Sequence, residues 1–376
     1  MLKKIKDIIL YKDKRFYSTF PATVKLDNGN ILLAFRRGRD FRHLLREDLP
    51  EDSKKLLHYA DHGDGRAQLN QIIFDKHFKP VTAVTTLPID PEVHDQDASL
   101  IILKNKSIML GSFAWYPMPS IFADSLEHNA VRTKNKEQAF LFWGGNIRLS
   151  EDNGKTWSPH RYLPVYPGDK TAYNRPTGAI RGQAIETENS LLLPAYADHP
   201  KASMTCCFFY RSLDSGKTWE CEDPIACDKP NELAFTEPSF HQCPSGKIVA
   251  FIRANDREYN SMLVTTDSVD DGKTWSPWIN HKITGCPFHP LKLPDNRVLL
   301  TYGYREKPFG IRARILDPEC NNIKNSEEII IRDDGTHGDV GYPWATLLNE
   351  HQILVTYYFT GEDSIRHIAA TLLNYN

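Results

Sequence analysis

The sequence is poor in cysteine, has no long apolar segment and carries almost no net charge over its 376 residues. No stretch approaches the ~18 apolar residues that a membrane-spanning helix requires. The apolar run near the start, at residues 8–10, is shorter than the ~7–15 residues of a signal-peptide core. We therefore predict no membrane span and expect a cytoplasmic location, with export left open as the alternative.

The seven cysteines are an odd number, and only Cys206 and Cys207 are adjacent. No C-x-x-C motif occurs, so we expect neither a disulfide framework nor a zinc site, which favours a reducing compartment. Lys and Arg number 46 against 48 Asp and Glu, for a net charge of −2. That balance argues against nucleic-acid binding, which usually needs a basic surface. The sequence leaves the oligomeric state undetermined.

Turn-forming and aromatic residues are plentiful. Aromatic residues make up 11%, and 24 prolines and 21 glycines accompany them, a mixture typical of β-rich proteins with many turns. One octapeptide pattern, S-x-D-x-G-K-T-W, occurs three times, at residues 150–157, 212–219 and 268–275. Asp followed two residues later by Gly predicts a tight hairpin turn, because the carboxylate accepts bonds from nearby N–H groups and Gly adopts positive φ. The Trp is expected to pack over the turn.

A second repeat, a polar turn followed by an apolar run, occurs six times. The runs begin at residues 31, 108, 191, 248, 298 and 353. Short strands in hairpins at this period predict an all-β, six-bladed propeller with blades of four antiparallel strands. We expect residues 1–376 to form a single propeller domain with insertions near 36–69 and 115–143, the first with one or two helical turns. The closing blade should combine strands from both termini.

The six units can be aligned on their apolar runs, and the residues that begin the preceding inner strands then correspond to one another. They are Phe20, Asp97, Arg181, Glu237, His289 and Tyr342. Because equivalent positions of a propeller converge near its axis, we expect these polar side chains to share one mouth. The second strands add Arg36 and Arg253, with Arg305 slightly later in its blade.

The three octapeptides resemble the Asp boxes, or BNR repeats, of the sialidase (neuraminidase) superfamily. Together with the six hairpin units, the resemblance covers nearly the whole chain, and it implies a propeller. It also implies a glycoside hydrolase that releases a terminal sialic or related 2-keto ulosonic acid from a glycan or glycoconjugate, with retention and with no cofactor or metal. In that family the nucleophile is a tyrosine, because the substrate's carboxylate would repel an ionised carboxylate nucleophile.

The resemblance extends to individual residues. Glu237, in T-E-P-S, resembles the glutamate that takes the proton of the tyrosine, and Tyr342, in G-Y-P, resembles that nucleophile. Arg253 and Arg312 resemble two of the three arginines that hold the substrate carboxylate, a task suited to the bidentate guanidinium.

Two positions depart from the family pattern. Thr19 stands where the family has its first arginine, and Arg36 or Arg37 is the expected replacement. The acid that protonates the leaving group is expected at Asp40, with Asp97 and Asp95 as alternatives. The other residues expected to contact substrate are Arg181, Arg305, Asp95 and His289.

The missing arginine keeps two alternative functions open. One is a propeller glycosidase or lyase for a different sugar, and the other is a carbohydrate-binding propeller without catalysis. An acid, a tyrosine and several arginines meeting within ~5 Å would favour catalysis over binding. In particular, the Tyr342 hydroxyl and the Glu237 carboxylate should be in hydrogen-bond contact, at about 2.6–3.2 Å, if they are a nucleophile and its base.

Overall fold

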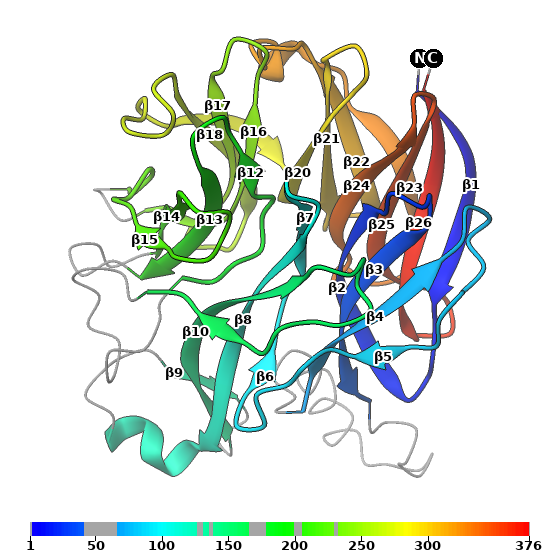
Figure 1. Ribbon diagram of the computed structural model, residues 1–376, viewed down its shortest axis with the longest axis vertical. Coiled ribbons are helices and arrows are strands. Elements are labelled where there is room, and N and C mark those ends of the chain that lie inside the picture. The colour runs from blue at the N-terminus through cyan, green and yellow to red at the C-terminus, as the bar shows by residue number, and fades with distance from the viewer. Residues whose placement is uncertain are drawn as a thin grey trace.

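The computed structural model describes residues 2–40, 66–125, 131–134, 138–164, 178–198, 205–228 and 232–375. The strands form six antiparallel sheets that follow one another around a ring, as Figure 1 shows. Each sheet is one blade, and its first strand along the chain lies nearest the axis, except in the closing blade, which ends with the N-terminal strand. The six-bladed all-β propeller predicted from the repeats is confirmed.

Blades one to three occupy the first part of the ring. Blade one contains β2 (Phe16–Lys25), β3 (Ile31–Arg39), β4 (Gln68–Phe74) and β5 (Thr85–Thr86). Blade two contains β6 (His94–Asp95), β7 (Ser99–Ile102), β8 (Ile108–Pro119), β9 (Val131–Lys134), β10 (Gln138–Ser150) and β11 (Arg161–Tyr162), with η2 (Ser120–Ser125) after β8. Blade three contains β12 (Ile185–Glu186), β13 (Leu191–Asp198), β14 (Thr205–Ser212) and β15 (Glu220–Cys221).

Blades four to six complete the ring. Blade four contains β16 (Ala234–Gln242), β17 (Ile248–Asn255), β18 (Ser261–Ser268) and β19 (Ile279–Thr284). Blade five contains β20 (Cys286–Lys292), β21 (Val298–Tyr304), β22 (Phe309–Leu316) and β23 (Ile329–Gly335), with η4 (Ile323–Asn325) before β23. Blade six contains β24 (Gly341–Asn349), β25 (Gln352–Thr360), β26 (Arg366–Tyr375) and β1 (Leu2–Tyr11).

The two ends of the chain close the ring together. Strand β1 pairs antiparallel with β26, from Leu2 opposite Tyr375 to Tyr11 opposite Ile368. The N- and C-termini accordingly lie side by side in Figure 1. This arrangement confirms that the closing blade combines both ends, and it gives β26 a hydrogen-bonded partner in place of an open edge.

The six apolar runs are buried because each lies in the second strand of a blade and has a neighbouring blade on each side. In β3, Leu32 and Ala34 pack with Leu100 and Leu110 of blade two. The alternate residues Leu33 and Phe35 pack with blade six. Successive side chains of a strand point to opposite faces, so a strand covered on both faces needs a continuous apolar run rather than an alternating one.

The three Asp boxes form the same turn. In the second box, Asp214 accepts a hydrogen bond from Ser212 Oγ at 2.8 Å and from the backbone N–H of Thr218 at 2.8 Å. Ser215 and Gly216 take the left-handed φ values of 57° and 83°. Bonds of the same kind form around Asp152 and Asp270. The carboxylates are therefore used inside the turns, as the sequence predicted.

A β-bulge recurs in the inner strands of blades one, four and six. At Phe20, Glu237 and Tyr342 the backbone adopts φ values of 55°, 52° and 53°. Each of these residues precedes a proline, and the pairing register with the second strand shifts at each site. Positive φ is uncommon for residues other than glycine, and a bulge redirects the side chain locally. Three equivalent positions thus share one unusual conformation.

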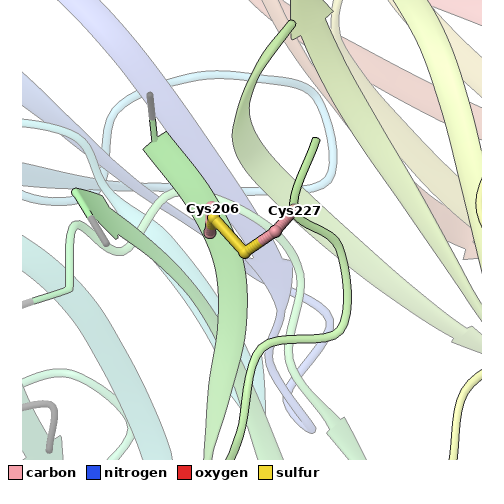
Figure 2. The surroundings of a disulfide bond; sticks show 2 residues. All are labelled: Cys206 and Cys227. Carbon is pink, nitrogen blue, oxygen red and sulfur yellow. A yellow bond between two sulfur atoms is a disulfide. The ribbon is translucent and has the colours of Figure 1, made fainter. Parts of the chain in front are cut away.

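The sequence predicts no disulfide framework, but one disulfide bond is present. Cys206 of β14 is bonded to Cys227, with the two Cα atoms 4.8 Å apart (Figure 2). The backbone of Ala226 bridges to Cys207, which brings the next residue beside Cys206. The sequence carries no spacing that predicts this contact, because residues 222–228 run along β14 without forming a recognisable strand pattern. Five other cysteines are free.

The two predicted insertions are described to different extents. Most of the first, with its expected helical turns, falls at residues 41–65 and lies outside the described residues. Within the second, β8 and β10 extend to pair Pro119 with Gln138, and η2 and β9 follow β8. Among the described residues, no helix has the length and apolar character needed to cross a membrane.

Candidate functional site

The hydroxyl of Tyr342 donates a hydrogen bond to Oε1 of Glu237. Tyr342 is the second residue of β24 and Glu237 the fourth of β16, so two inner strands bring them to the same end of the axis. This end is named the mouth below. The two groups are in the direct contact that a nucleophile and its base require.

Arg253 connects the pair. Its Nη1 lies 3.0 Å from Glu237 Oε2 and 3.5 Å from the Tyr342 hydroxyl. The guanidinium is itself held by Asn255 and Ser261, which accept from Nε at 3.1 and 3.2 Å. Burial, followed by the charges of Glu237 and Asp97, raises the pKa of Tyr342 well above its ordinary value. The phenol therefore keeps its proton until a reaction transfers it.

Arg305 lies beside the same tyrosine. Its Cζ is 5.6 Å from the centroid of the Tyr342 ring, and its guanidinium donates to the Tyr358 hydroxyl at 2.7 Å and to Asp339 at 3.3 Å. The Asp339 carboxylate also accepts hydrogen bonds from Tyr17, Tyr358 and Arg366. This network ties blades one, five and six together beside Tyr342.

Asp97 occupies the break between β6 and β7, two residues before Ser99. Its Oδ2 lies 3.6 Å from Arg181 Nε. Burial, reinforced by the nearby Glu237 carboxylate, raises the pKa of Asp97 to about 7 in spite of the opposing effect of Arg181. A substantial share of the Asp97 carboxyl groups therefore holds a proton near neutral pH, which is the state a general acid needs.

Arg181 connects the inner parts of three blades near the propeller axis. Its guanidinium donates to the carbonyl oxygens of Ala98 at 3.0 Å and of Tyr342 at 3.2 Å. Its Cζ lies 5.1 Å from the centroid of the Tyr342 ring. The residue is 2% exposed. Arg181 thus joins blades two, three and six from within, and it supports the site from below.

Asp95, by contrast, forms a buried ion pair. Arg148 Nη2 donates to its two carboxylate oxygens at 2.8 and 2.9 Å, and His160 Nε2 lies 3.1 Å from Oδ1. Burial opposes ionisation of Asp95, but Arg148 and His160 outweigh it and hold its pKa well below the usual range. Its contacts suit a permanent carboxylate that stabilises blade two.

The two expected replacements for the missing arginine lie in different places. Arg36 is directly opposite Thr19 in the register of β2 and β3, and it is fully buried with Nε 3.3 Å from the carbonyl oxygen of Asp95. Arg37 is half-buried, its Cζ lies 4.1 Å from the centroid of the Phe16 ring, and its Nη1 donates to Tyr11. Arg37 lines a cavity of about 240 Å³ in blade one, with Phe16, Arg39, Arg66, Gln68, Asn70 and Thr86.

Arg312 is not the second arginine beside Tyr342. It donates to the carbonyl oxygens of Arg332 at 2.7 Å and Pro308 at 3.1 Å, and its Nε lies 3.6 Å from Glu328. These partners belong to the outer part of blade five. Arg305, the residue that follows β21, lies beside Tyr342 instead.

His289 is displaced from its predicted position. It pairs with Thr301, as Trp344 pairs with Thr356, so it is the counterpart of Trp344 and not of Tyr342. The register shift between Cys286 and Phe288 causes the offset. Its ring lies 4.3 Å from that of Trp344, and burial followed by the charge of Arg181 lowers its pKa to about 3. A neutral histidine one layer below the mouth is a packing residue.

Asp40 follows the last residue of β3. Its backbone N–H donates to the carbonyl oxygen of Arg15 at 2.9 Å, and the residue is 8% exposed. It therefore lies at the mouth end of blade one, next to the range 41–65 that is outside the described residues. Its role as the acid stays a prediction.

The sequence missed one group near the pair, the side chain of Tyr196. Burial and the nearby charges of Glu237 and Asp97 raise the pKa of Tyr196, on β13, well above its ordinary value. Phe20 packs edge-on against Tyr342, with ring centroids 4.6 Å apart. Phe20 belongs to the aligned axial residues, but no sequence pattern marks Tyr196, because the second strands are distinguished only by their arginines.

The geometry supports two kinds of chemistry. A phenol bonded to a carboxylate can lose its proton as it attacks an electrophilic carbon. Two arginines beside it can bind an anionic group. Among the described residues, no cluster of three metal-ligating side chains lies around Tyr342 and Glu237.

Comparison with known proteins agrees with the propeller fold. A family profile for the BNR repeat-like domain matches residues 129–350. A protein of unknown function from Dyadobacter fermentans has a similar structure, with a TM-score of 0.88, 31% identity, and coverage of 100% of this chain and 99% of that one. No curated protein matches the sequence.

Sialidases have the same fold at much lower identity. The NanB sialidase from Streptococcus pneumoniae gives a TM-score of 0.63 at 12% identity, covering 97% of this chain and 70% of that one. A leech intramolecular trans-sialidase, solved with 2,7-anhydro-Neu5Ac, gives 0.62 at 13% identity with the same coverages. These likenesses extend the shared fold to enzymes that act on sialic acids.

Proposed function

Because the chain belongs to the BNR repeat-like domain family, whose propeller it shares with sialidases, we propose that it is a sialidase-like glycoside hydrolase. It removes a terminal 2-keto ulosonic acid, sialic acid or a relative, from a glycan, with retention. The observation that carries the proposal is the hydrogen bond from Tyr342 to Glu237 at the mouth. The wider class, a glycosidase-like propeller, has the support of the family and the fold.

In the first step the Tyr342 oxygen attacks the anomeric carbon and the bond to the aglycone oxygen breaks. The phenol proton passes to Glu237, which already accepts its hydrogen bond. The aglycone oxygen takes a proton from the acid form of Asp97, which a pKa of about 7 keeps populated at neutral pH. The product is a glycosyl–tyrosine ether, a neutral carboxyl at Glu237 and a carboxylate at Asp97.

In the second step a water molecule attacks the same carbon and the bond to Tyr342 breaks. The Asp97 carboxylate accepts the proton of the water, and Glu237 returns its proton to the departing phenolate. Two displacements at one carbon retain its configuration. Both side chains then have their starting protonation states, so no other reagent is needed.

The substrate's carboxylate needs a cationic site next to the anomeric carbon. Arg253 and Arg305 both lie next to the Tyr342 side chain, so they are its proposed ligands. A carboxylate held there lies near the reacting carbon because the two groups are attached to each other in a 2-keto acid sugar. Arg36 is the proposed third cation, since it stands across the β2–β3 pair from Thr19.

Thr19 is also the observation that favours a second candidate. Without an exposed third arginine, the same tyrosine and glutamate can serve a glycosidase or lyase for a different acidic sugar. The two candidates share the covalent step at Tyr342 and differ in the substrate. A panel of substrates therefore separates them.

The test is release of free 2-keto acid sugar from α-linked sialosides and from Kdn and Kdo glycosides. Tyr342→Phe removes the nucleophilic oxygen and retains the ring, and it should abolish release. Tyr357→Phe is the matched control, because Tyr357 is a buried tyrosine of blade six whose hydroxyl bonds to Thr371 at 2.7 Å.

Two results would separate the hypotheses. Turnover of one substrate, lost in Tyr342→Phe and kept in Tyr357→Phe, identifies the sugar and supports the tyrosine mechanism. Absence of turnover across the panel by folded protein contradicts the ulosonic-acid proposal. Binding of the same glycosides without turnover, seen by calorimetry, would then favour a carbohydrate-binding propeller.

A further inference from the structure

Three soft metal-ligating side chains gather between blades four and five, away from the mouth. They are His241 of β16, Cys243 just after it, and Cys320 in the turn that follows β22. Their potential ligand atoms all lie within 4.8 Å of one another, and all three residues are buried. His241 stands four residues after Glu237 on the same strand, which is ~13 Å away at ~3.3 Å per residue.

The histidine in this cluster is incompletely bonded. His241 is 3% exposed, and its Nε2 has no hydrogen-bond partner among the described residues. A buried polar atom normally has a partner. With two sulfur atoms within reach, a metal ion would give that nitrogen a partner.

Two turns hold the cysteines in place independently of any ion. Glu319, next to Cys320, accepts hydrogen bonds from the backbone N–H of Ser245 at 3.1 Å and from its hydroxyl at 2.5 Å. Lys247 Nζ donates to the carbonyl oxygen of Glu319 at 2.6 Å. The turn at residues 243–247 is thus bonded to the turn at residues 317–322, so the two thiols come from preorganised backbone.

We propose that His241, Cys243 and Cys320 bind a zinc ion that joins blades four and five. Nitrogen and thiolate sulfur are the ligands zinc prefers, at about 2.0–2.3 Å. Ligand atoms around one tetrahedral zinc lie roughly 3.5–3.8 Å apart, so the present separations, all within 4.8 Å, require a closure of at most about 1.3 Å. Two thiolates also neutralise the dipositive ion, which suits a site among the apolar side chains of Leu316 and Ile323. A fourth position remains for a small ligand.

This inference departs from the expectation of no zinc site. That expectation rested on the absence of a C-x-x-C motif, but the H-x-C pair at 241–243 and Cys320 lie 77 residues apart in the chain. Only the packing of two blades brings them together. The site is independent of the proposed glycosidase, because it belongs to the opposite end of β16.

The test titrates the purified, reduced full-length protein with Co²⁺, which replaces zinc and reports thiolate ligation through charge-transfer absorption. We expect about one equivalent to bind, and zinc to displace it. Cys243→Ser and Cys320→Ser should each weaken binding by more than the ~10–100-fold that loss of an outer-shell partner costs. Cys221→Ser is the control, because that half-buried thiol lies in blade three.

Failure of the reduced wild type to develop thiolate–cobalt absorption would overturn the proposal, whatever the variants do. So would binding that both serine variants retain. A Cys243–Cys320 disulfide in the untreated protein, mapped by mass spectrometry, together with no cobalt binding after reduction, would replace the metal site by a redox pair. Circular dichroism checks the fold of each variant, and Cys320→Ala serves if a serine variant does not fold.

Discussion

A Cβ atom built on Gly182 would lie 1.6 Å from the carbonyl oxygen of Pro238. The inner strands of blades three and four are in direct contact here, since the backbone N–H of Phe240 donates to the carbonyl oxygen of Gln183 at 3.0 Å. Pro238 follows Glu237 in the bulge that sets the position of the proposed base. The absence of a side chain at Gly182 therefore allows Glu237 to reach Tyr342.

We predict that Gly182→Ala displaces the bulge and lowers turnover of the cleaved substrate by ~100-fold, the usual effect of a misplacement of about 1 Å. Overpacking also costs ~1–3 kcal/mol of unfolding free energy. Steady-state kinetics and chemical denaturation measure the two effects. Gly361→Ala is the control, because its nearest neighbour would be 3.7 Å away. Equal activity of the two variants would contradict a role for this contact.

The raised pKa of Asp97 predicts that both kcat/KM and the free energy of unfolding depend on pH. As a protonated acid with a pKa of about 7, it should make kcat/KM fall as pH rises through about 7. Its folded pKa is raised above the ordinary 3.8, so the folded state retains a proton that the unfolded chain releases. The free energy of unfolding should therefore decrease as pH rises from about 4 to 7, by up to ~1.4 kcal/mol per pH unit.

Asp97→Asn tests both dependences. It should remove the decrease in stability over this pH range and slow the cleavage of poor leaving groups more than that of acidic phenols, which leave without a proton. Asp40→Asn is the comparison. If Asp40→Asn abolishes the alkaline decrease in kcat/KM and Asp97→Asn leaves it intact, Asp40 is the acid.

Arg305 and Arg312 distinguish two assignments of the carboxylate site. Arg305→Lys should raise KM for the acidic sugar by ~10–100-fold, since a hydrogen bond to a charged group contributes ~1.5–3 kcal/mol. Arg312→Lys should change KM little, because Arg312 donates to carbonyl oxygens of blade five. Initial-rate kinetics with one substrate decides between them, and a larger KM effect at Arg312 would reinstate it as the substrate ligand.

The buried ion pair of Asp95 and Arg148 should affect the free energy of unfolding and not the reaction. Arg148→Met leaves a buried carboxylate without its cation and should cost ~3–5 kcal/mol. Because the folded pKa of Asp95 is depressed, the contribution of the pair is present above the unfolded pKa near 3.8 and is lost as pH falls below it. Denaturation with urea at pH 7 and pH 3 measures both.

A surface pair provides the control for that measurement. Arg297 and Asp295 are bonded at 2.7 Å, but their side chains are 41% and 45% exposed. Arg297→Met should therefore cost less than ~1 kcal/mol. A similar loss for both variants would show that burial does not set the cost at Asp95.

The sequence predicts the fold well because the information is local. Each apolar run and each Asp box can be recognised within about ten residues, and six similar units leave few arrangements. The mutual contact of Glu237, Arg253 and Tyr342 can be anticipated for a related reason, since their positions follow from the hairpin register of each blade.

The errors arise where one residue changes the register or where the contact is between blades. A bulge next to Pro287 shifts the register of β20, so His289 corresponds to Trp344, two residues beyond Tyr342. Counting residues from the apolar run does not reveal this shift. Arg305 and Arg312 flank one hairpin, and only the folded blade shows which of them turns toward Tyr342. Cys206 and Cys227, 21 residues apart, meet through an isolated backbone bridge that has no sequence signature.

The repeated bulge gives the propeller a modular character that an enzyme engineer can use. Phe20 has the same backbone conformation as Glu237 and Tyr342, and its ring already touches that of the tyrosine. A new functional group at position 20 would therefore enter the mouth without the design of a new loop. In such a scaffold the chemistry can diversify by exchanging single side chains at equivalent positions while the strands remain unchanged.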